Sequence, residues 1–281
     1  MGVKKSYFGE FIVSSKPNLV VSDIGGTLAY GDISIPEKTG EVFHKLIMQD
    51  IPVILITGFN FHTTKKYVSN LNKNIILMPQ NGTLCIKNEK LIWEYLIEQD
   101  VIRQIYSFLE KKELPIIVYK GFNENFTVLY EGRGIFKRDF PFQEMKNLDN
   151  FEGTTGISTI VKYDSIDMVS KNIKEIIGDR LQMIRVKEEK YYWLEVSPKK
   201  VRKDLAIKRF CKENDISLSD VIFFGDNYND LELLRSVGHP VIVNNAIDEI
   251  KNEFKTVADS VYNEGVAKYL INLFDLDKNE K

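Results

Sequence analysis

The chain has 281 residues, 43% of them hydrophobic, with a formal net charge of −2 at pH 7 and a pI near 6.0. A chain of this length and composition can bury a full hydrophobic core and is long enough for two domains. Its nearly balanced charge excludes a dedicated polyanion binder, so we expect no nucleic-acid partner, although a small anionic ligand needs only a few placed cations.

No apolar run in the sequence approaches the ~20 residues that a membrane helix requires. No secretory apolar region follows Met1 either. The two cysteines, Cys85 and Cys211, lie far apart and lack metal-ligand spacing, which argues against a disulfide framework or a zinc site. We therefore expect a cytoplasmic protein without a membrane partner, while the sequence does not indicate an oligomeric state.

Short apolar runs that stop at polar residues mark the predicted strands of a sheet. They lie at 19–21, 52–56, 221–224 and 241–243. Such runs are typical of strands buried on both faces. Helical stretches are predicted between them, at 37–48, 203–213 and 231–236. This alternation predicts an α/β fold with a doubly wound parallel sheet, in which ligands bind beyond the carboxyl ends of the strands.

The middle of the chain has a different pattern, which predicts an inserted α+β domain. Strands are expected at 116–119, 126–130, 158–163, 182–186 and 191–196, and helices at about 98–111 and 165–177. We therefore divide the chain into a core domain, residues 1–82 and 197–281, and an inserted cap domain, residues 83–196. Gly132, Gly134, Gly153 and Gly156 are expected to bracket a loop of this domain.

An aspartate, Asp23, follows the first predicted strand and precedes the small residues Gly25 and Gly26. A carboxylate in this position can be surrounded by backbone N–H groups and can attack a phosphoryl group to form an aspartyl-phosphate. Taken alone, the pattern is weak, because aspartates and glycines are common in turns at strand ends.

Three further segments carry chemistry of the same kind. Thr57 and Gly58 end the second strand and offer a hydroxyl and an N–H for phosphate oxygens. Lys203 begins a helix and could neutralise a transferring phosphoryl group, although its basic neighbours favour a solvated helix residue when it is considered alone. Asp226 ends a late strand, with Asn229 and Asp230 on the next turn, so Asp23 and Asp226 form the hard oxygen pair that Mg²⁺ prefers.

In their order and strand-end placement, these four segments resemble the motifs of the haloacid dehalogenase (HAD) superfamily. Three other segments resemble those of its Cof-like members, and they lie at 79–82, 241–246 and 264–267. An insert between the second motif and the lysine motif is the placement of a C2-type cap. The chain is thus identified as similar to Cof-like, type IIB HAD hydrolases, with a Rossmann-like core and an inserted cap.

The resemblance implies a Mg²⁺-dependent phosphatase acting on a small phosphorylated metabolite, with a sugar phosphate as the expected substrate. Asp23 would be the nucleophile and a metal ligand, and the Gly25 carbonyl and Asp226 would complete the protein ligands. Asp230 would hold metal-bound water. The phosphate would be bound by Thr57, Gly58, Lys203, Asn229 and Gly26.

The sequence departs from the family pattern at two positions. Phosphatases of the superfamily carry an acid/base aspartate two residues after the nucleophile, where this chain has Gly25. General acid–base catalysis typically contributes ~10²–10⁴-fold, so ester hydrolysis is expected to be slow. Phe59 stands where Cof-like sequences usually have arginine. His62 is the histidine that could replace the missing acid, although a surface role is the more common one for such a residue.

These departures leave alternatives open. The chain could be a phosphatase with impaired turnover, or a HAD-fold phosphate-binding or regulatory protein that keeps the site and has lost catalysis. A third interpretation is a simple aspartate-to-glycine change in an ordinary phosphatase. The presence of both Lys203 and Asp226 favours a functional site, because an abandoned site would be expected to lose them. The sequence does not identify the substrate.

Overall fold

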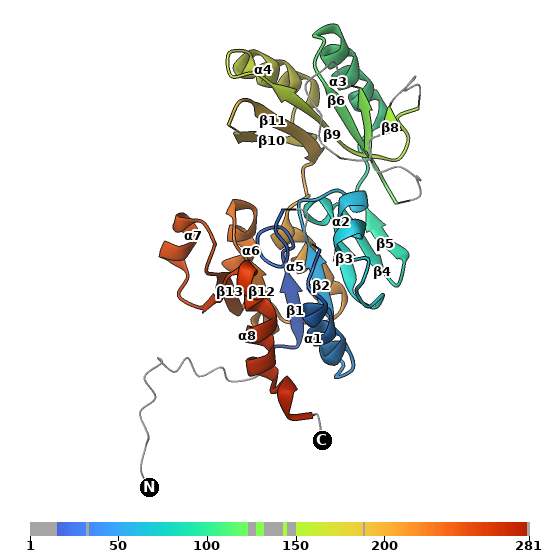
Figure 1. The fold of residues 1–281 in the computed structure, drawn as a ribbon. Helices are drawn as coiled ribbons and strands as arrows, with labels where there is room; N and C mark the ends of the chain where they lie inside the picture. The colour runs from blue at the N-terminus through green and yellow to red at the C-terminus, as the bar shows by residue number, and fades with distance from the viewer. Residues whose placement is uncertain are drawn as a thin grey trace.

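The computed structural model describes residues 16–31, 34–122, 128–131, 143–144, 150–187 and 189–279. Within this part of the chain, two separate sheets organise the fold (Figure 1). The larger sheet has eight strands in the order β14-β13-β12-β1-β2-β3-β4-β5, and the smaller has six in the order β10-β11-β9-β6-β7-β8. No helix in the described ranges is long and apolar enough to cross a membrane.

The centre of the larger sheet is parallel, as predicted. Its six parallel strands are β1 (Leu19–Ser22), β2 (Val53–Ile56), β3 (Ile76–Met78), β12 (Val221–Gly225), β13 (His239–Val243) and β14 (Val257–Ala258). An antiparallel hairpin, β4 (Leu84–Lys87) and β5 (Lys90–Glu94), extends one edge. The helices that accompany this sheet are α1 (Glu37–Ile47), α2 (Phe61–Tyr67), α5 (Lys203–Glu213), α6 (Leu231–Leu234), α7 (Asp248–Glu253) and α8 (Gly265–Phe274).

Helices cover both faces of this sheet, which is why its strands are apolar throughout. In β1, Val20 packs into a core with Phe43 of α1 and Leu270 of α8. Its neighbour Val21 points to the opposite face, into a core with Ile207 of α5. Alternate side chains of a strand point to opposite faces, so a strand covered on both sides needs a continuous apolar run. This doubly wound α/β arrangement confirms the predicted fold class.

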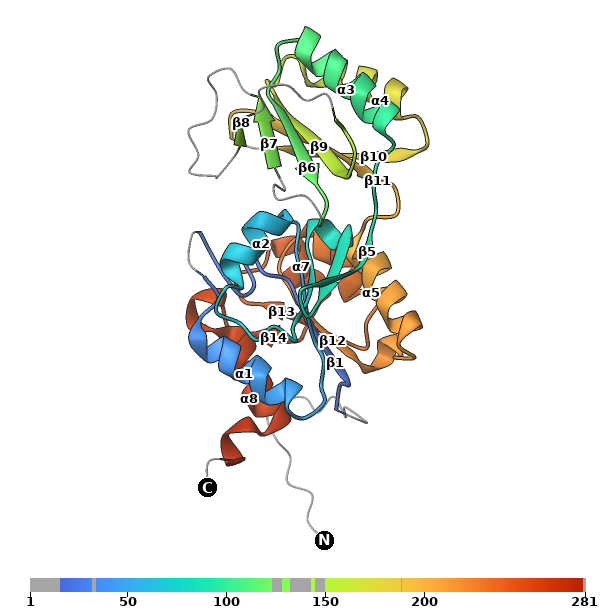
Figure 2. The same ribbon diagram turned by 90° about the vertical axis from the view of Figure 1, so that its right-hand side faces the viewer.

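The smaller sheet is mainly antiparallel and belongs to the middle of the chain. Its strands are β6 (Ile116–Lys120), β7 (Val128–Glu131), β8 (Gln143–Glu144), β9 (Thr154–Val161), β10 (Leu181–Lys187) and β11 (Tyr192–Pro198). Two helices, α3 (Gln99–Lys111) and α4 (Ile166–Ile177), pack on one face through an apolar cluster of their own. Both views show the opposite face of the sheet turned toward the larger domain (Figures 1 and 2).

In the middle of the chain, the structure differs from the sequence-based expectation at a glycine and bears on the predicted domain boundary. Gly156 was expected to bracket a loop, but it lies inside β9. A Cβ atom at this position would come within 3.1 Å of the Tyr119 ring on the adjacent strand, so the glycine allows the ring to lie against the sheet. Gly132 and Gly134 lie outside the described residues. The division at residue 83 stays a prediction, and the hairpin that follows it, β4 and β5, pairs with the larger sheet.

Candidate active site

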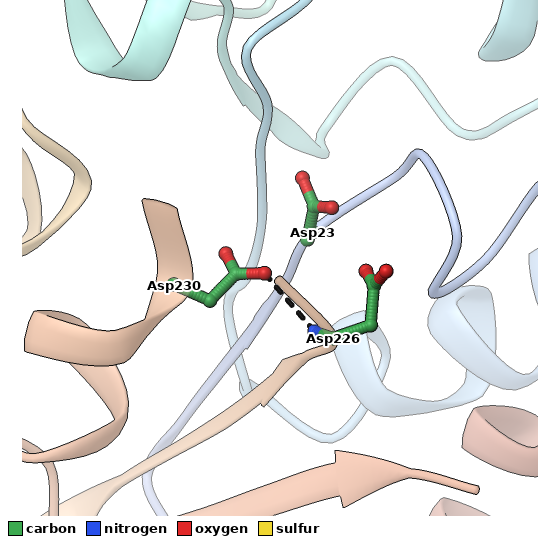
Figure 3. Close-up of side chains that lie close together, drawn as sticks. All are labelled: Asp23, Asp226 and Asp230. Carbon is green, nitrogen blue, oxygen red and sulfur yellow. Dashed lines mark hydrogen bonds between the residues drawn. The ribbon is translucent and has the colours of Figure 1, made fainter. Parts of the chain in front are cut away.

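Three carboxylates meet at the carboxyl edge of the larger sheet (Figure 3). Asp23 directly follows β1, Asp226 directly follows the neighbouring strand β12, and Asp230 lies on the turn after it. One oxygen atom of each lies within 4.8 Å of the others, and all three residues are buried. Residues at 23 and 226 are far apart in sequence and become neighbours because their parallel strands pair.

The ammonium group of Lys203 lies inside this cluster. Its Nζ is 2.6 Å from Oδ1 of Asp23 and 2.7 Å from Oδ1 of Asp230. The residue opens α5 and is only 1% exposed, although Lys199 and Lys200 just before it are exposed. The solvated-residue interpretation of Lys203 is therefore wrong, because two buried carboxylates draw its charge into the site.

Close backbone packing at two glycines sets the positions of the carboxylates. Gly26 has a φ of +83°, and a Cβ atom there would collide with the carboxylate of Asp226. A Cβ atom on Gly225 would lie 2.8 Å from the Cβ of Asp230. The second oxygen of Asp230 accepts the backbone N–H groups of Asp226 (3.0 Å) and Asn227 (3.1 Å). Asp230 therefore has two roles: one carboxylate oxygen stabilises the turn after β12, and the other binds Lys203 in the cluster.

Two polar side chains that sequence reasoning missed support the nucleophile loop. The hydroxyl of Thr27 donates to Oδ1 of Asp226 at 2.7 Å. The amide of Asn245 donates to the Gly26 carbonyl at 2.7 Å, and its oxygen accepts the Val261 N–H at 2.8 Å. Asn245 lies in a segment that carries the family resemblance, so its position was singled out, but its partners depend on how separate loops meet.

The Thr57 loop forms the next part of the strand edge. Thr57 is 2% exposed, and its Oγ1 accepts the Phe59 N–H at 3.2 Å. Asn81 braces this loop: its N–H donates to the Thr57 carbonyl at 2.7 Å, and its side-chain oxygen accepts the Asn229 amide at 3.2 Å. A Cβ atom on Gly58 would lie 3.6–3.7 Å from these two amides, so the predicted phosphate-binding residues Thr57, Gly58 and Asn229 lie together.

The two positions that depart from the family pattern are in contact. A Cβ atom on Gly25 would lie 2.8 Å from Cζ of Phe59. His62, by contrast, is an exposed residue of α2 and lines a cavity of about 500 Å³ together with Phe61 and Phe122. None of the three carboxylates lines that cavity. The placement of His62 therefore gives no support to the hypothesis that it replaces the acid.

Burial dominates the electrostatics of the cluster. It raises the pKa of Asp23 to about 7 and that of Asp226 to about 6, and the charge of Asp230 adds to both. Burial alone would lower the pKa of Lys203, but the charges of Asp23 and Asp230 outweigh it and hold that pKa above its ordinary value. The ammonium is therefore charged at neutral pH, whereas the two aspartates lack enough positive charge to ionise readily.

This charge imbalance fits a divalent cation. Three buried carboxylates face one buried ammonium, and buried anions require compensation by pairing or by a metal. All the side-chain donors are hard carboxylate oxygens, which suit Mg²⁺ and not a soft metal. The residues present thus match the ion that the sequence predicts.

The parallel sheet, the strand-end aspartates and the buried lysine define a hydrolase-like α/β protein. A family model described as haloacid dehalogenase-like hydrolase matches residues 20–270, and the chain belongs to this family. It is 24% identical over 280 residues to 5-amino-6-(5-phospho-D-ribitylamino)uracil phosphatase of Bacillus subtilis, covering 90% of this chain and 97% of that protein.

Solved structures agree with this assignment. A haloacid dehalogenase-like hydrolase from Bacteroides thetaiotaomicron superposes with a TM-score of 0.79 at 19% identity, covering 92% of this chain and all of that one. A sugar phosphatase of HAD subclass IIB superposes with a TM-score of 0.67 at 20% identity, covering 93% of this chain and 100% of the other. The predicted superfamily and Cof-like, IIB-type architecture are confirmed.

Proposed function

We propose that the chain is a Mg²⁺-dependent phosphatase in which Asp23 attacks a small phosphorylated metabolite. The observation that carries this proposal is the buried Lys203 ammonium, 2.6 Å from the Asp23 carboxylate in a haloacid dehalogenase-like hydrolase. An ammonium in a water-poor site stabilises charge that develops on a phosphoryl group during attack. It also favours the ionised, nucleophilic form of the Asp23 carboxylate, against the larger effect of burial.

The neighbouring loop would hold the phosphate in line with Asp23. Thr57 accepts an N–H at its oxygen and can donate its own hydrogen to a phosphate oxygen. The Gly58 N–H and the Asn229 amide are the other proposed donors, and Asn81 keeps the loop and this amide together. Gly26, beside the nucleophile, is proposed to line the phosphate site, while its own N–H donates to the Ala29 carbonyl at 2.7 Å.

Asp23, Asp226 and the Gly25 carbonyl are the proposed Mg²⁺ ligands, with Asp230 orienting water around the ion. When bound, Mg²⁺ would neutralise negative charge on the phosphate and on the carboxylates. Asp23 would then form a bond to phosphorus as the bond to the leaving oxygen breaks. Water would subsequently release inorganic phosphate and return the free carboxylate.

The middle domain is proposed to act as a cap over this site. We place its start after β5, because β4 and β5 pair with the larger sheet. The face of its sheet that does not pack on α3 and α4 is turned toward the core (Figure 1) and carries Tyr119, Ser158 and Glu195. Tyr119 and Ser158 are buried there, and the Ser158 hydroxyl donates to that of Tyr119 at 3.1 Å. Such groups suit a small polar metabolite. The structural likeness to a sugar phosphatase makes sugar phosphates the first compounds to screen.

The two thiols, Cys85 and Cys211, are both free and buried, which fits the proposed reducing cytoplasm.

A binding or regulatory protein is the second candidate function, and the absence of a side chain at Gly25 is the observation that favours it. Such a protein would bind Mg²⁺ and phosphate without releasing product.

Phosphate release from a panel of sugar phosphates and p-nitrophenyl phosphate tests the proposal, with and without Mg²⁺. We expect Mg²⁺-dependent phosphate release by the wild type and none above background by Asp23→Asn. In the wild type, acid quench during turnover should trap a phosphoryl group on Asp23. Phosphate and Mg²⁺ binding with neither release nor phosphorylation would instead support the binding-protein function.

A further inference from the structure

The missing acid and the unusual Phe59 form a single structural feature. The distance that joins them is short: a Cβ atom added to Gly25 would lie 2.8 Å from Cζ and 3.2 Å from Cε2 of the Phe59 ring. The ring therefore occupies the volume into which any side chain at position 25 would extend. In sequence the two residues lie on different loops, after β1 and after β2, and only the fold brings them together.

The Phe59 ring is partly buried and packs against the core cluster that contains Phe43 and Leu270. It stacks on Tyr67 of α2 with a centroid distance of 5.1 Å and an interplanar angle of 11°. Tyr67 is itself 8% exposed and donates its hydroxyl to the Gly31 carbonyl. The Phe59 backbone donates to Thr57 Oγ1 at 3.2 Å and accepts the Gln80 N–H at 2.8 Å. Displacing the ring would therefore break the stack on Tyr67 and its packing against the core cluster.

The other ionisable groups that we place at this strand edge are already engaged. Lys203 is bound by two carboxylates, and Asp226 accepts the Thr27 hydroxyl. Asp230 accepts the Lys203 ammonium and two backbone N–H groups. Beside Gly25, the structure has an aromatic ring where a proton donor would be required, and an aromatic hydrocarbon neither gives nor takes a proton.

We propose that Phe59 closes the acid position of the site, so that Gly25 and Phe59 together select phosphoryl donors whose leaving group departs without a proton. This inference rests on the proposed phosphatase function and narrows its substrates to acyl phosphates and comparable anhydrides. Phe59 is then a specificity-determining residue. The glycine at position 25 and the phenylalanine at position 59 act together, because the ring fills the space that an aspartate at position 25 would need.

This selection follows from the charge that the leaving oxygen acquires during phosphoryl transfer. As an Asp23 oxygen bonds to phosphorus, the bond from phosphorus to the leaving oxygen breaks and its electron pair stays on that oxygen. From an acyl phosphate the product is a carboxylate, whose conjugate acid has a pKa of about 4 and which needs no proton at pH 7. From an alkyl phosphate the product would be an alkoxide, which must be protonated as it leaves. Sugar phosphates are therefore expected to react slowly.

The proposal is tested by measuring turnover, expressed as kcat/KM, of acetyl phosphate and glucose 6-phosphate in four proteins: wild type, Gly25→Asp, Phe59→Ala and the double variant. This ratio reports the formation of the aspartyl-phosphate, whereas kcat also includes its hydrolysis by water, a step common to both substrates. Asp23→Asn supplies the background for the spontaneous hydrolysis of acetyl phosphate. In wild type we expect acetyl phosphate to exceed glucose 6-phosphate by roughly 10²-fold or more, the lower part of the range for general acid catalysis. Gly25→Asp alone should raise glucose 6-phosphate turnover by less than about tenfold, and the double variant by roughly 10²-fold or more.

Tyr269→Ala is the matched control, because Tyr269 is also a partly buried aromatic packed against the same core cluster. Combined with Gly25→Asp, it should give no gain beyond the single variant. Melting temperatures supply a second measurement that does not depend on turnover: Gly25→Asp should lower the melting temperature more in the wild-type background than with Phe59→Ala. Phe59→Leu, which lacks the ring Cζ atom, replaces Phe59→Ala if the latter does not fold.

The outcomes separate the inference from the proposed function. Full gain from Gly25→Asp alone, or wild-type glucose 6-phosphate turnover equal to that of acetyl phosphate, would overturn the selection by Phe59 while leaving the phosphatase intact. If wild type and Asp23→Asn do not differ on any donor, the phosphatase proposal itself fails and the substrate inference fails with it. In that case, equal melting shifts in both backgrounds would further exclude the contact between positions 25 and 59.

Discussion

The hydroxyl of Thr27 donates a 2.7 Å hydrogen bond to Asp226, a residue 199 positions away in the chain. This bond opposes the effect of burial, which raises the pKa of Asp226. Thr27→Val keeps the shape of the side chain but removes the donor, so Asp226 should hold its proton more tightly and bind Mg²⁺ less well. We expect Mg²⁺ affinity to fall by about 10–100-fold, the usual effect of losing a group that supports a metal ligand.

Isothermal titration calorimetry of wild type, Thr27→Val and Thr27→Ser checks this prediction. The serine variant retains the hydroxyl and should bind Mg²⁺ nearly as wild type does. Equal affinities for Thr27→Val and Thr27→Ser would show that the bond does not support the metal site.

Replacing Lys203 by methionine should strongly slow phosphoryl transfer and destabilise the metal-free protein. The substitution keeps an unbranched chain but leaves Asp23 and Asp230, both buried, without their common cation. Turnover of the best substrate should fall by about 10²–10³-fold, as is typical when one stabilising donor is removed from an active site.

Lys200→Met is the matched control, since this exposed lysine lies three residues before Lys203. Stopped-flow or steady-state assays at saturating Mg²⁺ should show the loss only in Lys203→Met. A similar loss in both variants would mean that general positive charge near the site, and not the buried ammonium, supports catalysis.

Asn245 connects the nucleophile loop to the segment after β14, and its removal should loosen both. Asn245→Leu deletes the bonds to the Gly26 carbonyl and from the Val261 N–H. Two such bonds contribute about 1–3 kcal/mol of folding free energy together. We expect a melting temperature lower by several degrees and a higher KM, because Gly26 lies beside Asp23. The exposed neighbour Asn244 provides the control, and Asn244→Leu should change neither quantity appreciably.

The strand-end aspartates could be predicted from sequence, because both the strand and its end are determined by a few consecutive residues. An apolar run followed by Asp23 or Asp226 fixes both the strand and the position of the polar side chain at its end. The ammonium of Lys203 could be assigned only through the family resemblance. The basic residues just before it, Lys199, Lys200 and Arg202, are exposed, while its partners lie 180 and 27 residues away.

The contact between Gly25 and Phe59 could not be predicted, because it depends on the relative position of two loops. Each departure is visible in the sequence by itself, but nothing in the sequence links the two. Asn81 lies in a segment that carries the family resemblance, but its partners could not be predicted for the same reason. Its backbone N–H binds Thr57 and its side-chain oxygen binds Asn229, and these two residues lie on separate loops. The position of Gly156 within β9 could not be predicted either. A glycine can mark a turn or make room for a neighbouring side chain, here the Tyr119 ring, and the sequence alone does not distinguish the two.

The stability of the folded protein should depend on pH, and Mg²⁺ should change this dependence. Asp23 and Asp226 have folded-state pKa values of about 7 and about 6, above the ordinary value of 3.8, and burial is the main cause. The folded state therefore binds these protons more tightly than the unfolded state does. Their stabilising contribution is fully present below about pH 3.8 and is lost as the pH rises through about 6 and then about 7. The melting temperature of the metal-free protein should thus fall between pH 5 and pH 8.

Mg²⁺ should reverse this trend, because it binds the ionised carboxylates and competes with their protons. At a Mg²⁺ concentration of about 100 times Kd, the melting temperature should rise by roughly 5–10 °C at pH 8, and by much less at pH 5. Thermal unfolding at constant ionic strength, in EDTA and in Mg²⁺, checks both arms. In Asp226→Asn one of the titrating groups is gone, so the metal-free fall near pH 6 should flatten and the Mg²⁺-induced rise should shrink. A Mg²⁺ effect that is equal at pH 5 and pH 8, or unchanged in Asp226→Asn, would show that the ion binds away from these carboxylates.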